Sequence, residues 1–305
     1  MKQFYSIRFN KKFSLLRLLF LCILIISPSL LVSFGNSHVF AGPWTIPQGG
    51  LYVNYSAVRT TFDEVTLFNG EKKDVGEVRF FSNSVLFDYG LLNNLNIHAI
   101  IPYEYSSQEG DGGRNAAFAD GRFGLKYRFL SEENGAPLSL ALGSELKIPL
   151  SAYKTDSLAA HGDQQIDYDF RLYLGRYFNI SGLTSYADIE GGYRFRTEST
   201  PNEVFGFAEF GLFLCKKISF RAFTYGVNAF GGLGLMSPEF MEIMMQRGTP
   251  PFPQVGEDYV KAGLGLSFFP TDHLDVGFFW SRNVYSKNTS INDDNIGISV
   301  GYKFW

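Results

Sequence analysis

This 305-residue sequence contains very little cysteine and has no large excess of positive or negative charge. The only cysteines are Cys22 and Cys215, and 27 basic residues against 30 acidic ones leave a net charge of −3. A charge so close to balance argues against a dedicated nucleic-acid binder, so we expect no nucleic-acid partner. With 45% apolar and 19% charged residues, the chain is neither disordered nor a bundle of long apolar transmembrane helices.

Aromatic residues and glycine are abundant instead. Aromatic residues make up 17% of the chain, and there are 32 glycines. Rings favour strands and glycines favour turns, so this composition predicts many short strands joined by turns. The composition therefore favours one all-β domain over helical packing.

Residues 1–41 have the pattern of a secretory signal peptide. A basic start is followed by an apolar run over Leu18–Val32, and the segment ends on Val39-Phe40-Ala41, a suitable site for signal peptidase. An uncleaved anchor is the alternative, but the run is shorter than the roughly 20 residues that a spanning helix needs. We predict cleavage near Ala41, which removes Cys22. Cys215 then has no disulfide partner, and we interpret it as a small buried apolar residue.

The remaining region, residues 42–305, alternates between apolar and polar residues over segments of about ten residues, which is the signal of β-strands. Between Ala119 and Phe129, for example, Phe123 and Leu125 fall on one face while Arg122 and Lys126 fall on the other. The pattern predicts twelve strands, near 49–62, 75–90, 94–108, 117–130, 137–149, 164–178, 182–197, 203–216, 218–233, 257–269, 273–286 and 294–305.

The connections between these strands alternate between short turns and longer polar loops. An even strand number with short turns on one side and long loops on the other is typical of an outer-membrane barrel. We therefore predict a transmembrane antiparallel β-barrel of about twelve strands with both termini in the periplasm. A secreted β-sandwich is the alternative fold. Aromatic residues near strand ends, such as Tyr52 and Trp280, would then lie at the two membrane interfaces.

Several segments also resemble one family of barrels. A "tyrosine, glycine, turn, strand, proline-tyrosine" hairpin runs from Phe87-Asp88-Tyr89-Gly90 to Ile101-Pro102-Tyr103. The strand Phe118–Phe129, the strand Leu142–Pro149 and the tail Gly301-Tyr302-Lys303-Phe304 extend the similarity over most of the chain after the leader. The sequence resembles the outer-membrane β-barrels named after the meta-pathway of phenol degradation, which are similar in style to the fatty-acid and toluene transporter barrels.

This resemblance implies an outer-membrane channel, with hydrophobic or aromatic compounds as candidate solutes. It carries no substrate residue over to this chain. It also implies a C-terminal assembly signal, here Tyr302, Phe304 and Trp305, although such signals usually end on the aromatic residue of a Tyr-x-Phe unit. The partners implied are outer-membrane lipids including lipopolysaccharide, the barrel assembly machinery and an unidentified small molecule. The location implied is the outer membrane of a Gram-negative bacterium.

The polar faces of the predicted strands carry charges of both signs. Two interpretations remain open: a polar, weakly selective lumen, or a ladder of paired charges that stiffens a narrow or closed barrel. The candidate lumen-lining residues are Asp120, Arg122, Lys126, Arg128, Glu145, Lys147, Asp167, Asp169, Arg171, Asp188, Glu190, Arg194, Arg196 and Lys261.

The loop 234–256 holds every methionine that follows the leader. Ser237 can cap a helix, Pro238 suits its first position and Gly248 can end it. Phe240, Ile243 and Met244 would share one face of that helix. The loop is either a lid or capture site for apolar solutes, or a helix that only packs on the rim. The residues that would form this site are Met236, Phe240, Met241, Ile243, Met244 and Met245.

No catalytic, cofactor or metal-binding motif stands out. His98, His161 and His273 lie beside no serine nucleophile motif and no cluster with metal-ligand spacing. We therefore expect passive diffusion of small molecules through the barrel. The alternatives are a non-conducting structural or surface-binding barrel and, third, a lipase-type hydrolase with a Ser–His pair formed across neighbouring strands.

Overall fold

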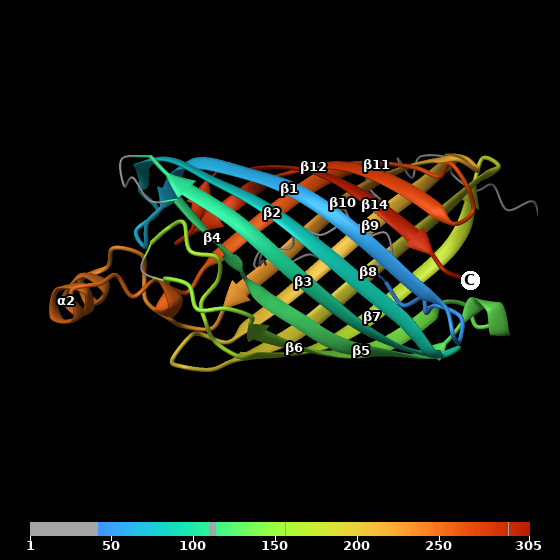
Figure 1. The fold of residues 1–305 in the computed structure, drawn as a ribbon, viewed down its shortest axis with the longest axis horizontal. Coiled ribbons are helices and arrows are strands. Elements are labelled where there is room, and N and C mark those ends of the chain that lie inside the picture. Colours follow the sequence, from blue (N-terminus) through green and yellow to red (C-terminus); the bar gives the residue numbers. More distant parts are fainter. Residues whose placement is uncertain (1–41, 110–113, 156, 292) are drawn as a thin grey trace, which may run out of the picture.

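The computed structural model describes residues 42–109, 114–155, 157–291 and 293–305; the predicted leader lies outside these ranges. Most of the described chain forms one tilted, closed sheet of antiparallel strands (Figure 1). The strands are β1 (Leu51–Thr66), β2 (Lys72–Leu92), β3 (Leu95–Gln108), β4 (Arg114–Phe118), β5 (Asp120–Leu130), β6 (Ser139–Pro149), β7 (Asp167–Ile180), β8 (Leu183–Arg196), β9 (Glu203–Cys215), β10 (Ile218–Ala229), β11 (Asp258–Phe268), β12 (Leu274–Lys287), β13 (Ser290–Ile291) and β14 (Asp294–Lys303).

Strand β1 closes the sheet, because it pairs with β2 on one side and with β14 on the other. Tyr52 lies opposite Asp88 of β2 and opposite Lys303 of β14. Strands β4 and β5 both pair with β3, and β13 and β14 both pair with β1, so each couple acts as one strand of the wall. The wall therefore has twelve strands in sequence order, which confirms the predicted antiparallel barrel and excludes a sandwich of two sheets.

The alternation in the sequence separates an apolar outer face from a polar inner face. On β7, Asp167, Asp169 and Arg171 are buried, whereas the residues between them are apolar and exposed. A soluble protein buries its apolar face, so this reversed distribution belongs to a wall that faces hydrocarbon. The exposed apolar residues of β7 are Tyr168, Phe170, Leu172 and Leu174, with exposed fractions of 36–56%.

Two placements differ from the sequence interpretation. Tyr52 is not at an interface: it shares the inner face of β1 with Asn54 and Ser56, and its hydroxyl donates to Asp275 of β12. Its side chain is fully buried. Cys215 is exposed rather than buried, because it ends β9 where the chain turns into β10.

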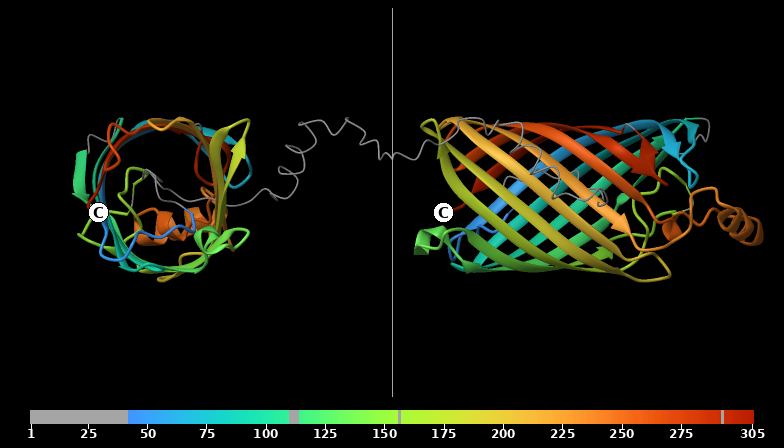
Figure 2. Two further views of the ribbon diagram at one scale, coloured as in Figure 1. Left: turned by 90° about the vertical axis from the view of Figure 1, so that its right-hand side faces the viewer. Right: turned by 180° about the vertical axis from the view of Figure 1, so that it is seen from behind.

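The short turns and the C-terminus lie at one end of the barrel, which we call the turn end, and the long loops lie at the other, the loop end (Figure 1). Helix α2 (Pro238–Arg247) extends beyond the loop end (Figures 1 and 2). Among the described residues, no helix is both long and apolar enough to cross a membrane.

Helix α2 begins and ends where the sequence predicts. The Ser237 hydroxyl accepts a hydrogen bond from the backbone N–H of Phe240 at 3.2 Å, Pro238 opens the helix, and Gly248 ends it in the left-handed region. Its apolar face enters a small cluster that we call the loop-end core. The buried residues of that core are Val65, Leu235, Phe240 and Val255, with Phe62, Leu67, Val75, Leu158, Leu233, Met236, Met241, Met244 and Phe252 packed around them.

Two of the predicted loop residues lie elsewhere. Ile243 is outside the loop-end core, and Met245 is 74% exposed. The buried face of α2 therefore uses Phe240, Met241 and Met244, and it packs against the hairpin of β1 and β2.

Substituting Phe240 should loosen α2 without opening the barrel. Phe240→Ala removes a fully buried ring, a change that costs about 3–5 kcal/mol in a packed core. We expect faster proteolysis within residues 234–256, with unchanged heat-modifiable migration of the barrel on a gel. The matched control is Met245→Ala, whose exposed side chain should leave the proteolysis rate at the wild-type value; equal rates for both variants would contradict the packing described here.

Candidate functional site: the barrel interior

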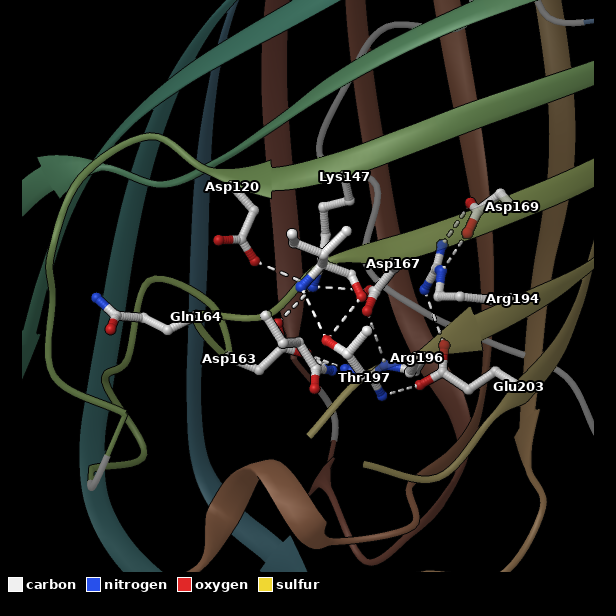
Figure 3. Close-up of polar contacts among 12 residues, drawn as sticks. Asp120, Lys147, Asp163, Gln164, Asp167, Asp169, Arg194, Arg196, Thr197 and Glu203 are labelled. Carbon is white, nitrogen blue, oxygen red and sulfur yellow. Dashed lines mark hydrogen bonds and ion pairs between the residues drawn. The ribbon is translucent and has the colours of Figure 1, made fainter. Parts of the chain in front are cut away.

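A continuous series of ion pairs crosses the inner face from β5 to β9, and we call it the ion-pair ladder; His98 of β3 joins it through a 3.1 Å contact with Glu145. Figure 3 shows the part of it around Lys147, Arg194 and Arg196. The register places Asp167 of β7 opposite Lys147 of β6 and Arg196 of β8, and Asp169 of β7 opposite Arg194 of β8. The ladder consists of His98, Asp120, Arg122, Glu145, Lys147, Asp163, Asp167, Asp169, Arg171, Glu190, Arg194, Arg196 and Glu203.

The middle of the ladder is centred on Asp169. Its carboxylate accepts from Arg194 Nε at 2.7 Å and from Arg171 Nη2 at 2.6 Å. Arg171 also donates to Glu145 at 2.7 Å, and Arg122 donates to the same carboxylate at 2.6 Å. Asp169 is thus shared by three arginines, since Arg122 also reaches it at 3.5 Å, and Glu145 is shared by two. The side chains of Asp169 and Arg194 are only 1% and 2% exposed. Charges so well buried are stable only when they are paired in this way.

Towards the loop end the ladder continues through Lys147. Its Nζ lies 2.8 Å from Asp167 and 3.1 Å from Asp120, and it also contacts Asp163. Arg196 joins this group to the middle of the ladder, since it contacts both Asp163 and Glu203 (Figure 3). Asp163 belongs to a loop rather than to a strand, so the ladder extends beyond the wall.

The loop that carries Asp163, residues 150–166, folds against the interior at the loop end. Ser106 of β3 donates to the Ala159 carbonyl at 2.7 Å, and Tyr153 donates to Asp120. Burial, together with the nearby Asp120 carboxylate, raises the pKa of Tyr153 above its ordinary value, so its hydroxyl stays protonated as a donor. Contacts of this loop therefore lie on the inner faces of β3, β5 and β6.

The turn end holds a second inserted segment, Gly42–Pro47, which we call the N-terminal plug. Seen along the barrel axis, it runs within the ring of strands (Figure 2, left). Lys126 of β5 donates to the Gly42 carbonyl at 3.0 Å, and the Ile46 N–H donates to Asn96 of β3 at 3.1 Å. The Trp44 ring packs on Tyr177 of β7 at a centroid distance of 4.7 Å. The plug therefore contacts the inner face through both hydrogen bonds and rings.

The rest of the inner wall carries separate charged groups rather than a continuous series: Arg221 pairs with Glu209 at 3.3 Å, and Asp275 accepts from Tyr52. On β1 and β2, Ser56 and Ser84 share a hydrogen bond of 2.8 Å between their hydroxyls. Strands β9 to β11 contribute an inner aromatic cluster of Phe205, Phe207, Tyr225, Val227 and Tyr259. Phe205 joins this cluster to the ladder, because the guanidinium groups of Arg171 and Arg194 lie 4.9 and 5.3 Å from its ring centroid.

Several side chains on both walls of the interior have almost no solvent-accessible surface. Asn54, Ser56 and Ser84 on one side are 1–3% exposed, and Arg194 and Phe205 on the other are 1% exposed. Side chains around a wide water-filled pore would be accessible to solvent. The interior is therefore narrow at the level of these residues, with a segment packed at each end.

The structure brings most of the candidate lumen residues together in the ladder and places four of them elsewhere. Lys126 binds the plug, and Asp188 lies beside it with no ion-pair partner among the residues described. Arg128 pairs with Glu133 at the turn end at 3.2 Å. Lys261 pairs with Asp293 at the loop end at 2.9 Å.

Sequence reasoning missed three kinds of contributor. Glu203 belongs to the ladder but is absent from the candidate lumen residues, although it lies on a predicted strand. Asp163 and the plug lie outside the periodic segments, where no alternation signals which way a side chain points.

At the C-terminus, the ring centroids of Tyr302 and Phe304 lie 4.7 Å apart and both rings are exposed on the outer side. Trp305 is exposed as well.

No family model matches the sequence, and no curated protein matches it either. Among solved structures, the COG4313 outer membrane channel from Pseudomonas putida F1 aligns with a TM-score of 0.66 over 87% of this chain and 98% of that one, at 13% identity. The fold is that of an outer-membrane β-barrel. The KdgM porin (TM-score 0.48, 8% identity, 83% of this chain and 99% of that one) and the NanC porin (0.46, 9%, 82% and 100%) align less well. The family resemblance noted in the sequence stays a prediction.

Removing one arginine from the ladder should destabilise the barrel strongly. Arg194→Met strips a partner from both Asp169 and Glu203 and leaves their buried carboxylates undercompensated, a loss of about 3–5 kcal/mol. Urea unfolding of the detergent-folded protein measures this loss. The control is Arg79→Met, which breaks only an exposed pair with Glu77 and should produce no measurable change. Equal unfolding midpoints for the two variants would show that the ladder contributes nothing to stability.

Glu257, which precedes β11 at the loop end, should make stability depend on pH. Burial, and to a lesser degree the nearby Glu203, raises its pKa to about 7. A raised acid pKa means that the folded state holds the proton more tightly than the unfolded state, so stability falls as pH rises from about 4.5 to 7. The melting temperature of Glu257→Gln relative to the wild type should therefore rise as pH increases from about 4.5 to 7. Above pH 7 the difference between the two proteins should stay constant. Glu239→Gln removes an exposed carboxylate from the same loop as a control; a pH-independent difference for Glu257→Gln would refute the assignment.

Proposed function

We propose that the protein is an outer-membrane channel for small molecules, with the turn end and both termini on the periplasmic side. The observation that supports this most directly is a wall that is apolar outside, polar inside and free of edges, with its two ends occupied by segments that are not part of the wall. Hydrocarbon offers no hydrogen bonds, so a closed sheet of this kind suits a membrane. The N-terminal plug and the loop 150–166 are held by side-chain contacts that can break while the sheet stays intact.

The interior favours solutes with little net charge. Acids and bases of the ladder neutralise one another, so they form no strong filter for anions or cations. We therefore assign hydrophobic or aromatic compounds as the solute class, which agrees with the family resemblance, and diffusion as the mechanism.

The remaining surfaces fit this location. Outer rows of exposed apolar residues, such as Ile296, Ile298 and Val300 of β14, would contact lipid, with lipopolysaccharide in the outer leaflet. The terminal rings Tyr302, Phe304 and Trp305 would be read by the barrel assembly machinery. Export would follow removal of residues 1–41. Packing of Met241 and Met244 in the loop-end core supports a structural role at the rim for the loop 234–256 rather than a capture site.

Conductance in a planar bilayer tests the proposal. The wild-type protein should give small, well-defined current steps, because plug and loop leave a narrow path. A variant that lacks Pro43–Pro47 should conduct several-fold more, since the turn end is then unobstructed. Removing the same number of residues from the loop 234–256 is the matched control, and its conductance should stay near the wild-type value. Silence of both the intact protein and the plug deletion would favour a non-conducting barrel.

A further inference from the structure

Asp188 of β8 is a buried carboxylate without a counter-ion. The residue is 2% exposed, and within the described chain neither of its oxygens has a hydrogen-bond partner. A charged, unpaired carboxylate in such a place is strongly disfavoured, so Asp188 either holds a proton or is completed by a cation, and a cation site needs a group placed next to it. The other buried acids near it are already satisfied: Glu209, opposite Asp188 on β9, accepts from Arg221 at 3.3 Å, and Glu190 accepts from Arg171 at 2.8 Å.

The first residue of the plug lies directly against Asp188. A methyl group added to the α-carbon of Gly42 would lie 3.2 Å from the Cβ of Asp188 and 2.7 Å from the Trp44 ring. Only a glycine fits this position without moving that ring. The Gly42 nitrogen is bonded to the same α-carbon, and among the described contacts its N–H makes no hydrogen bond to the Asp188 carboxylate.

Two further contacts hold Gly42 in this place. Lys126 is also buried, and its ammonium group donates a hydrogen bond to the Gly42 carbonyl at 3.0 Å. This bond joins Lys126 to the plug rather than to Asp188. The next two residues, Pro43 and Trp44, lie so close over Gly175 of β7 that a Cβ there would come within 2.8 and 3.0 Å of them. The inner faces of β7 and β8 therefore form a close-fitting socket for Gly42-Pro43-Trp44, and this fit sets the position of Gly42 at the start of the plug.

We propose that Asp188 is the binding site for the α-ammonium group of Gly42, which exists only after the leader has been cut off. This inference rests on the leader cleavage that forms part of the proposed function. In the precursor, the Gly42 nitrogen is a neutral amide. Hydrolysis of the Ala41–Gly42 bond adds the hydroxyl of water to the Ala41 carbonyl and a proton to the Gly42 nitrogen, which takes a second proton from solvent at neutral pH.

Cleavage thus creates a positive charge beside a carboxylate that lacks one. The new ion pair, together with the bond from Lys126 to the Gly42 carbonyl, clamps the first residue from both sides. Locking of the plug would accordingly be coupled to export: the precursor can place the segment in its socket, but only the processed chain neutralises Asp188.

Reactivity of the α-amino group tests this pairing. The protein is expressed with its leader, extracted from the membrane, and its first residue is read by N-terminal sequencing, with Gly42 expected. The folded protein is then treated with an amine-reactive ester and digested with trypsin. The peptide Gly42–Arg59 contains no lysine, so label on it reports the α-amino group alone.

Three variants decide the outcome. In Asp188→Asn, the Gly42 amino group should react at least tenfold faster than in the wild type, whereas in Asp188→Glu it should stay slow. Asp258→Asn removes a buried acid at the other end of the barrel, and its Gly42 amino group should react at the wild-type rate. Inserting one serine between Ala41 and Gly42 displaces the ammonium, so labelling should be fast with or without Asp188. Heat-modifiable migration confirms that each variant has folded.

Several results would overturn the inference and leave the channel proposal standing. A first residue other than Gly42 would do so, as would equal labelling rates for the wild type and Asp188→Asn. An additional effect of Asp188→Asn in the serine-extended protein would also contradict direct pairing. Conductance, by contrast, reports on the channel whether or not the ammonium binds Asp188.

Discussion

Closure of the sheet by β1 is the constraint on which the rest of the structure depends. Because β1 pairs with β2 and with β14, the wall has no free edge, and its backbone polar groups are satisfied within the sheet. Only then can the outer surface consist of apolar side chains. Closure also decides where charge can go: an ionisable residue on a strand has only the interior available, and there it must find a partner. The ion-pair ladder is the result.

Each end of the interior is occupied by a different kind of segment. At the turn end, the plug uses backbone hydrogen bonds and the Trp44 ring. At the loop end, residues 150–166 place Asp163 within the ladder itself, so that this closure is ionic. Helix α2 makes neither kind of contact, because its apolar face is used up in the loop-end core. The two closures therefore respond to different conditions, since salt weakens ionic contacts far more than it weakens stacked rings.

Sequence alone predicts the wall well, for a physical reason. Alternation along a strand is imposed by the contrast between lipid and interior, so each strand carries its own signal; β7 and β8 were found within a few residues of their bounds. The position of Tyr52 was predicted wrongly: an aromatic ring near a strand end suggested the membrane interface, but the register of β1 places Tyr52 on the inner face of the barrel. Segments without a period gave no such signal. The insertion of Asp163 and of Gly42–Pro47 depends on long-range contacts with β3, β5 and β6 to β8, which no local pattern encodes.

The sharing of acids within the ladder has a consequence for how this barrel changes over evolutionary time. Asp169 serves three arginines and Glu145 two, so losing one member disturbs charges on several strands at once. We therefore expect substitutions along β5 to β9 to be tolerated mainly as coordinated exchanges of acid and base, whereas the separate pairs Arg128–Glu133 and Lys261–Asp293 can change independently. Charge can accordingly change at the turn end and the loop end with little effect on the rest of the barrel, while the residues in the middle must change together.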